Sequence, residues 1–113
     1  MDGDLEFLEK LIGVPSVAGD VAAVNRAVAI VCERMESQGV WCAVERMEDG
    51  CDVAFASNDG LAKPDVLLCV HLDVVPADCP DMFIPPSEEY VKISSLGETF
   101  DLLSAYLRDR FAR

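Results

Sequence analysis

The stretch Val66-Leu67-Leu68-Cys69-Val70-His71-Leu72-Asp73-Val74-Val75-Pro76 decides the fold that the sequence predicts. An apolar run of strand length carries the only histidine of the chain, and an aspartate follows two residues later. Residues i and i+2 of a strand share one face, so His71 and Asp73 are expected to lie together at the end of a central strand over residues 65–72. Pro76 has no N–H for a strand ladder and marks the end of this segment.

His71 and Asp73 are the residue types of a metal ligand and the group that orients it. A neutral imidazole binds zinc well, and a nearby carboxylate fixes its tautomer and raises its basicity. A single histidine at a strand end is more often a structural residue, however, and one imidazole with one carboxylate does not make a zinc site. The spacing alone leaves both interpretations open.

The sequence His71-Leu72-Asp73-Val74-Val75-Pro76 resembles the first metal motif of the di-zinc aminoacylase and carboxypeptidase family, which includes acetylornithine deacetylase and succinyl-diaminopimelate desuccinylase. The resemblance implies that His71 binds zinc, with cobalt or manganese as alternatives, and that Asp73 orients the imidazole. It also implies a hydrolase of N-acyl amino acids or small peptides, in which the metal polarises the carbonyl and activates water. The link Gly-Val-Pro-Ser-Val-Ala-Gly, residues 13–19, is similar to a family loop as well.

The resemblance covers the two ends of a family sequence and not its middle. Residues 1–85 resemble the amino terminus of the family's catalytic domain, and residues 88–113, with Glu-Tyr-Val-Lys-Ile from Glu89, resemble its carboxy terminus. We therefore expect residues 1–113 to form a single partial catalytic domain without the family's lid and dimerisation domain. No segment matches the family's Gly-Arg-Gly-x-x-Asp-Met-Lys motif, whose aspartate bridges the two metals.

Four carboxylates after Asp73 are weaker candidates for the same site: Asp78, Asp81, Glu88 and Glu89. The family's Glu-Glu pair supplies a general base and a metal ligand, but the residues after Glu89 align better with the carboxy-terminal end, where this pair would be a surface acid. A hydrolytic zinc needs about three protein ligands. The sequence therefore predicts a weak or partial metal site and leaves open whether this chain is an active enzyme.

Apolar residues at helical spacing predict three helices. The first spans residues 4–13 with Asp4 as its cap, and the second spans residues 20–38 and ends at Gly39. The third begins at a capping box formed by Ser95 and Glu98 and carries an apolar stripe of Leu96, Phe100, Leu103 and Leu107.

Residues 40–47 and 52–57 have the composition of strands, and Glu48-Asp49-Gly50 between them carries an Asp-Gly hairpin signal. With the central strand, these elements predict an α/β fold. The expected architecture is a truncated zinc-exopeptidase-like domain, with three to four strands flanked by about three helices.

Composition narrows the class of protein and its partners. A hydrophobic content of 51% over 113 residues predicts a folded chain with one core. The net charge of −12 disfavours nucleic acid and anionic membranes as partners. No apolar run approaches the roughly eighteen residues that span a bilayer, and the acidic amino terminus is unlike a secretory signal, so we expect a cytoplasmic protein.

The cysteines predict no covalent framework. Their number is five, and no two have the C-x-x-C spacing, which disfavours disulfides and a thiolate zinc site. Cys32, Cys42 and Cys69 stand in apolar stretches and are expected to be small buried residues.

A second hypothesis is a non-enzymatic remnant that acts as an interaction module. A sheet that lacks some strands leaves an exposed edge, and such edges pair with other chains. In this case the chain would self-associate through the sheet edge and would not take up metal.

Overall fold

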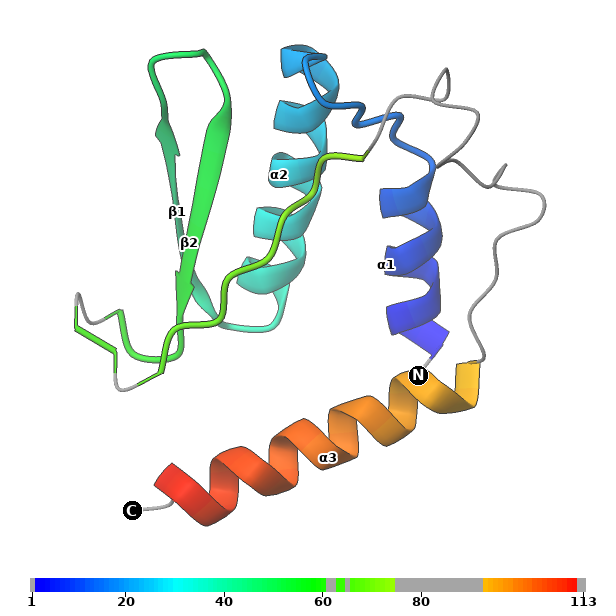
Figure 1. Ribbon diagram of the computed structural model, residues 1–113, viewed down its shortest axis with the longest axis vertical. Coiled ribbons are helices and arrows are strands. Elements are labelled where there is room, and N and C mark those ends of the chain that lie inside the picture. The colour runs from blue at the N-terminus through cyan, green and yellow to red at the C-terminus, as the bar shows by residue number, and fades with distance from the viewer. Residues whose placement is uncertain (1, 61–62, 65, 75–92, 112–113) are drawn as a thin grey trace. The chain divides into compact units, whose positions relative to one another are not determined.

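The computed structural model describes residues 2–60, 63–64, 66–74 and 93–111. The elements follow the order α1 (Asp2–Ile12), α2 (Val21–Ser37), β1 (Trp41–Arg46), β2 (Asp52–Ser57) and α3 (Ile93–Phe111), as Figure 1 shows. The chain divides into two compact units, Met1–Pro76 and Ala77–Arg113. The mixed α/β class is confirmed at this level, with three helices and one two-stranded antiparallel sheet within the described ranges.

Helix α2 has both ends that the sequence predicts. The side chain of Asp20 accepts a hydrogen bond of 3.1 Å from the amide of Ala23, which satisfies a free donor of the first turn. At the other end the amides of Gly39 and Val40 donate to the carbonyls of Glu36 and Met35. This is a Schellman motif, and Gly39 adopts the φ of +75° that the motif requires.

The hairpin of β1 and β2 forms where it was expected. The strands pair from Trp41 opposite Ser57 to Arg46 opposite Asp52. At the closed end, the guanidinium of Arg46 binds the carboxylate of Asp52 with N···O distances of 2.9 and 3.3 Å. The side chain of Asn25 on α2 accepts from the amide of Asp52 and donates to the carbonyl of Gly50, so it fixes the turn to the helix.

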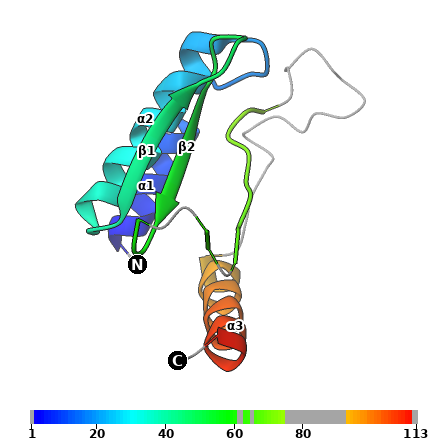
Figure 2. The ribbon, with the colours of Figure 1, turned by 90° about the vertical axis from the view of Figure 1, so that its left-hand side faces the viewer.

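Helix α2 lies between the hairpin and α1 and carries the core of the first unit. The two views of Figures 1 and 2 show the hairpin on one side of α2 and α1 on the other. Among the residues whose burial the structure describes, the buried hydrophobic ones all lie on α2: Ala23, Ala27, Val28 and Cys32. Because most of these side chains are small, the layers approach closely, but little apolar area is removed from water.

Charged side chains tie α1 to α2 at the surface. Asp4 accepts a hydrogen bond of 2.7 Å from the guanidinium of Arg34, which also lies over the ring of Phe7 at 5.8 Å. Helix α1 begins at Asp2, so the expectation that Asp4 caps it is wrong. Asp4 sits inside the first turn, where its charge favours both the helix amino terminus and the pair with Arg34.

The central strand expected over residues 65–72 is not formed in the part of it that the structure describes. Residues 66–73 have no strand backbone, and Val74 makes an isolated parallel bridge with Val17. The expected three to four strands are therefore two among the described residues. The apolar side chains fit a strand, but a strand is stabilised by cross-strand neighbours, and residues 66–73 pair with none among the described residues.

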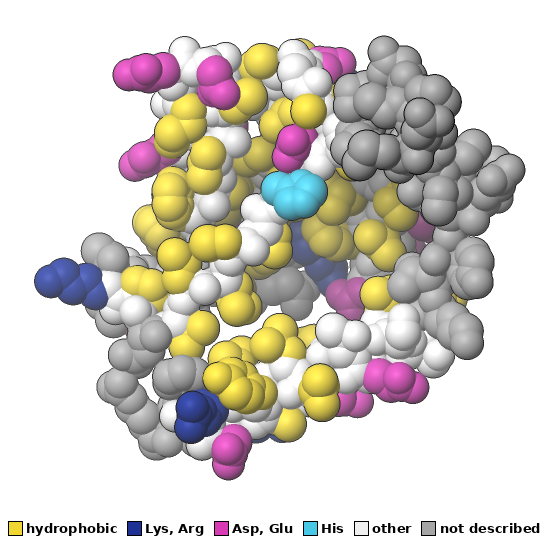
Figure 3. All heavy atoms as spheres, in the orientation of Figure 1, with side chains coloured by type: hydrophobic (Ala, Val, Ile, Leu, Met, Phe, Trp, Pro, Cys, Tyr) yellow, Lys and Arg dark blue, Asp and Glu magenta, His cyan; other side chains and the backbone are white. Residues whose placement is uncertain are grey.

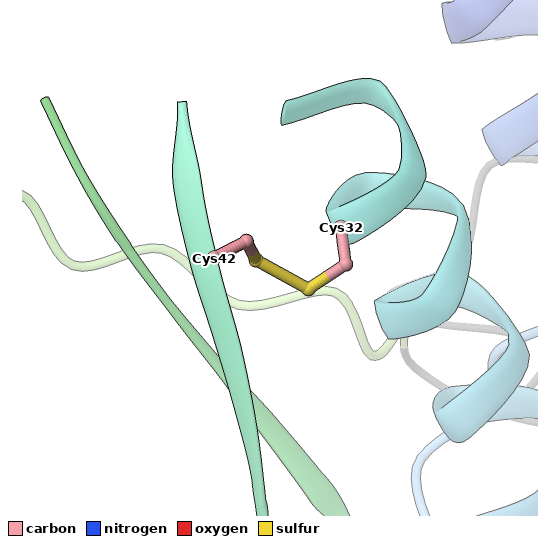
Figure 4. Close-up of a disulfide and its surroundings, with 2 residues drawn as sticks. All are labelled: Cys32 and Cys42. Carbon is pink, nitrogen blue, oxygen red and sulfur yellow. A yellow bond between two sulfur atoms is a disulfide. The ribbon is translucent and has the colours of Figure 1, made fainter. Parts of the chain in front are cut away.

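A disulfide joins Cys32 of α2 to Cys42 of β1, with the two Cα atoms 5.9 Å apart (Figure 4). The expectation that the cysteines form no disulfide is wrong at this pair. The sequence spacing of Cys32 and Cys42 did not indicate this bond. The bond links α2 to β1 and depends on how this helix and this strand pack against each other. Cys69 is exposed, so its expected burial is wrong as well.

Helix α3 is the described element of the second unit and begins at Ile93, two residues before the expected capping box. Ser95 is therefore inside the helix, and its carbonyl accepts a bond of 2.7 Å from the hydroxyl of Thr99. The predicted helix is confirmed and its cap is not. Of the predicted stripe, Phe100 is 68% exposed and Leu103 is 42% exposed, while Leu96 and Leu107 are half-buried. No helix in the described ranges is long and apolar enough to cross a membrane.

Candidate metal site around His71

The segment that carries His71 is held by the loop before α2. The hydroxyl of Ser16 donates to the carbonyl of Leu72 at 2.7 Å, and the amide of Val74 donates to the carbonyl of Ser16 at 2.9 Å. The amide of Ala18 closes the set with a bond of 2.9 Å to the carbonyl of Val74. Ser16 is only 4% exposed, so the two bonds that it makes are largely shielded from water. Together with the bond from Ala18 they fix the backbone on both sides of Asp73.

His71 and Asp73 lie together, as expected, although no strand places them. The imidazole Nδ1 is 3.0 Å from the backbone carbonyl oxygen of Asp73 and 3.4 Å from its carboxylate Oδ1. Irregular backbone brings the two side chains together, where the sequence predicted alternation along a strand. The imidazole is 85% exposed, and its cyan side chain stands on the surface in Figure 3.

The contact with the Asp73 carbonyl decides the tautomer of the neutral imidazole. A carbonyl oxygen only accepts, so Nδ1 must carry the hydrogen and donate it. The Nε2 atom then carries the lone pair, and it makes no hydrogen bond to the residues that the structure describes. This is the arrangement of a histidine that ligates a metal through Nε2 while its other nitrogen is held by a backbone or carboxylate oxygen.

The acidity of the Cys51 thiol is affected by the carboxylate of Asp73. Partial burial, followed by the carboxylates of Asp49, Asp52 and Asp73, raises the pKa of the Cys51 thiol. The side chain of Asp49 also accepts a hydrogen bond from the Cys51 amide at 2.9 Å. Since zinc and electrophiles react with the thiolate, a raised pKa makes Cys51 a poor ligand and a poor nucleophile at neutral pH.

The donors around His71 do not complete a zinc site. In the part of the chain that the structure describes, no group of three or more His, Cys, Asp and Glu side chains could hold a metal ion. The other candidates from the sequence, Asp78, Asp81, Glu88 and Glu89, lie outside the described residues. Within the described residues the structure therefore shows one imidazole beside one carboxylate, and we derive no catalytic step from this pair.

Comparison with family models, curated proteins and solved structures finds no match for this chain. The contacts between His71 and Asp73 are therefore the basis for the function proposed below.

Ser16 is the residue of this site that the sequence did not single out. The loop at residues 13–19 resembled a family loop, but no local pattern indicates that its hydroxyl bonds a carbonyl 56 positions away. Serine is mostly exposed in folded proteins, so its position between Pro15 and Val17 did not indicate that it would be buried.

Proposed function

We propose that this chain carries one ligand position of a metal site related to the zinc-dependent amide hydrolases that act on N-acyl amino acids or small peptides. His71 is the ligand through Nε2, and Asp73 is the group that orients it. The proposal joins the resemblance of the His-Leu-Asp-Val-Val-Pro motif to the geometry of the same residues.

One observation carries the proposal. An exposed histidine normally samples several rotamers and both neutral tautomers, whereas here Nδ1 is bonded to an oxygen of Asp73 and that residue is flanked by the bonds to Ser16 and Ala18. Because the imidazole is already ordered in the free protein, metal binding loses less side-chain entropy. A structural role would normally bury the ring, whereas the imidazole is 85% exposed.

The donor set limits what the site can do. One imidazole with one carboxylate binds a divalent metal weakly, and the described residues supply neither the further ligands nor a general base. We therefore expect metal uptake and no hydrolysis of N-acyl amino acids by His71 and Asp73 alone.

Calorimetric titration of the purified chain with zinc, and separately with cobalt, tests the proposal. We expect one weak equivalent in the wild type that is lost in His71→Ala. Asp73→Asn should retain weaker uptake, because its backbone carbonyl still orients Nδ1. Equal uptake by the wild type and His71→Ala would place the metal elsewhere and reject the proposal.

The exposed apolar surface of the first unit favours a second candidate function, an interaction module. The disulfide turns Cys42 towards α2, so the alternate residues of the hairpin face away from the helix. On that outer face Trp41 is 50% and Phe55 is 47% exposed. Large apolar side chains gathered on one face are typical of protein contacts.

A further inference from the structure

The disulfide between Cys32 and Cys42 crosses the packing layer between α2 and β1, as Figure 4 shows. Among the residues whose burial the structure describes, the other buried hydrophobic side chains are Ala23, Ala27 and Val28. Side chains of this size remove little apolar area from water, so their burial stabilises the first unit only modestly. The covalent link therefore supplies a large part of what keeps the hairpin on α2.

Hydrogen bonds attach the hairpin to α2 at its other end. The side chain of Asn25 accepts from the amide of Asp52 at 2.8 Å and donates to the carbonyl of Gly50 at 3.0 Å. Cys42 lies opposite Ala56 near the open end of the hairpin, whereas Asp52 lies at its closed end. Without the disulfide, the Asn25 bonds and contacts with small side chains are left to hold the two layers together.

The segment that carries His71 lies near the closed end of the hairpin. Burial first, and then nearby carboxylates that include that of Asp73, raise the pKa of the Cys51 thiol, and Cys51 directly follows the hairpin turn. The same segment is bonded through Ser16 and Ala18 to the loop that leads into α2. Its position therefore depends on α2 and on the hairpin being packed together.

We infer that the bond between Cys32 and Cys42 is a redox switch for the order of the His71 segment. In the oxidised chain α2 and the hairpin stay packed, and the bonds from Ser16 and Ala18 hold the segment in place. In the reduced chain the first unit opens far more often, and the imidazole loses its fixed position with the segment. Redox control of metal uptake rests on the proposed function, whereas redox control of the segment does not.

Thiol–disulfide exchange converts one state into the other. A dithiol such as dithiothreitol supplies two electrons and two protons, so the S–S bond breaks, Cys32 and Cys42 become thiols, and the reductant becomes a cyclic disulfide. Cys32 is 8% exposed but Cys42 is only half-buried, so the bond is not sealed within the core.

The loop that the disulfide closes determines the size of the effect. The two cysteines have a sequence separation of 10, and chain entropy for so short a loop predicts about a hundredfold change in the equilibrium between the folded and the opened chain. Amides that are exposed by this opening exchange their hydrogens in proportion to the same equilibrium. The amide of Ala18 donates to the Val74 carbonyl and the amide of Val74 to the Ser16 carbonyl, so both should lose about a hundredfold of their protection on reduction.

Hydrogen exchange of the ¹⁵N-labelled full chain, followed by NMR, tests the inference without metal. The amides of Ala18 and Val74 are compared in the oxidised wild type and after addition of dithiothreitol. The double variant Cys32→Ala, Cys42→Ala should resemble the reduced wild type and should not respond to dithiothreitol. Equal protection of both amides in the oxidised and the reduced wild type would overturn the inference. A response of the double variant to dithiothreitol would place the redox effect at another cysteine and would overturn it as well.

Zinc titration separates this inference from the proposed function. The double variant is used here, because the thiols of the reduced wild type bind zinc themselves. Apparent affinity falls with the fraction of molecules in which the site is ordered, so we expect weaker uptake by the double variant than by the oxidised wild type. No uptake by either chain, with the predicted loss of amide protection, would reject the proposed function and support the redox switch. Uptake that requires His71, with equal amide protection in both redox states, would reject the switch and support the proposed function.

Discussion

The hydroxyl of Ser16 donates a hydrogen bond of 2.7 Å to the carbonyl of Leu72 and so joins two loops that are 56 positions apart. Ser16 lies in the link between α1 and α2, and Leu72 separates His71 from Asp73. A buried hydroxyl without its acceptor costs free energy, so this bond holds the Leu72 backbone in one place. The orientation of the imidazole follows from it.

Replacing Ser16 by Ala should therefore act on stability and on the site together. The Leu72 carbonyl loses its donor in a shielded position, and we expect the free energy of unfolding to fall by about 1–2 kcal/mol. Ser37→Ala is a matched control, because its hydroxyl bonds the Arg34 carbonyl at an exposed helix end and its loss should cost under about 0.5 kcal/mol. Urea denaturation of both variants measures the difference. Equal effects would show that the Ser16 bond does not hold the segment.

The disulfide between Cys32 and Cys42 should make stability depend on redox conditions. It closes a short loop with a sequence separation of 10, and the chain-entropy model gives a stabilisation of about 3 kcal/mol for a loop of this length. We expect the double variant Cys32→Ala, Cys42→Ala to unfold at lower urea concentration than the oxidised wild type and at nearly the same concentration as the reduced wild type. Thiol titration of the denatured, unreduced chain should find Cys51 and Cys69 reactive and Cys32 and Cys42 unreactive. Reactive Cys32 and Cys42 would contradict the bond.

The ion pair at the closed end of the hairpin should set part of the acid stability. The hydrogen bond from Arg46 holds the pKa of Asp52 below its ordinary value. The Asp52 carboxylate of the unfolded chain therefore binds a proton more readily than that of the folded chain. The ion pair stabilises the fold fully above the ordinary carboxyl pKa. This stabilisation is lost as the pH falls from roughly 5 through the lower pKa of the folded state.

Asp52→Asn should accordingly flatten the fall in the free energy of unfolding below about pH 5 relative to the wild type. Urea denaturation at a series of pH values measures both slopes. A steeper slope in Asp52→Asn than in the wild type would contradict the assignment.

Those parts of the fold that depend on local signals could be predicted from the sequence. Asp20 and Gly39 gave the ends of α2, and Asp49-Gly50 gave the hairpin, because caps and tight turns are determined by the residues within them. The central strand could not be predicted correctly, since its formation depends on a neighbour that no local pattern reveals. The same limit hid the pairing of Cys32 with Cys42.

The candidate site contains both a local contact, which could be predicted, and a long-range contact, which could not. The closeness of His71 and Asp73 was predicted correctly for the wrong reason, because a spacing of two residues allows contact in several backbone conformations. The bond that fixes them, from Ser16, is a long-range contact and could be found only in the folded chain.

Nitrogen NMR of the single imidazole tests the central claim most directly. In a ¹⁵N-labelled chain with a neutral imidazole, His71 gives one pair of ring signals, and we predict a protonated Nδ1 and an unprotonated Nε2. On titration with zinc the Nε2 signal should shift and the Nδ1 signal should keep its proton. A protonated Nε2 in the free chain, or a zinc-dependent shift of Nδ1 in its place, would contradict the claim that Asp73 orients His71 for a metal.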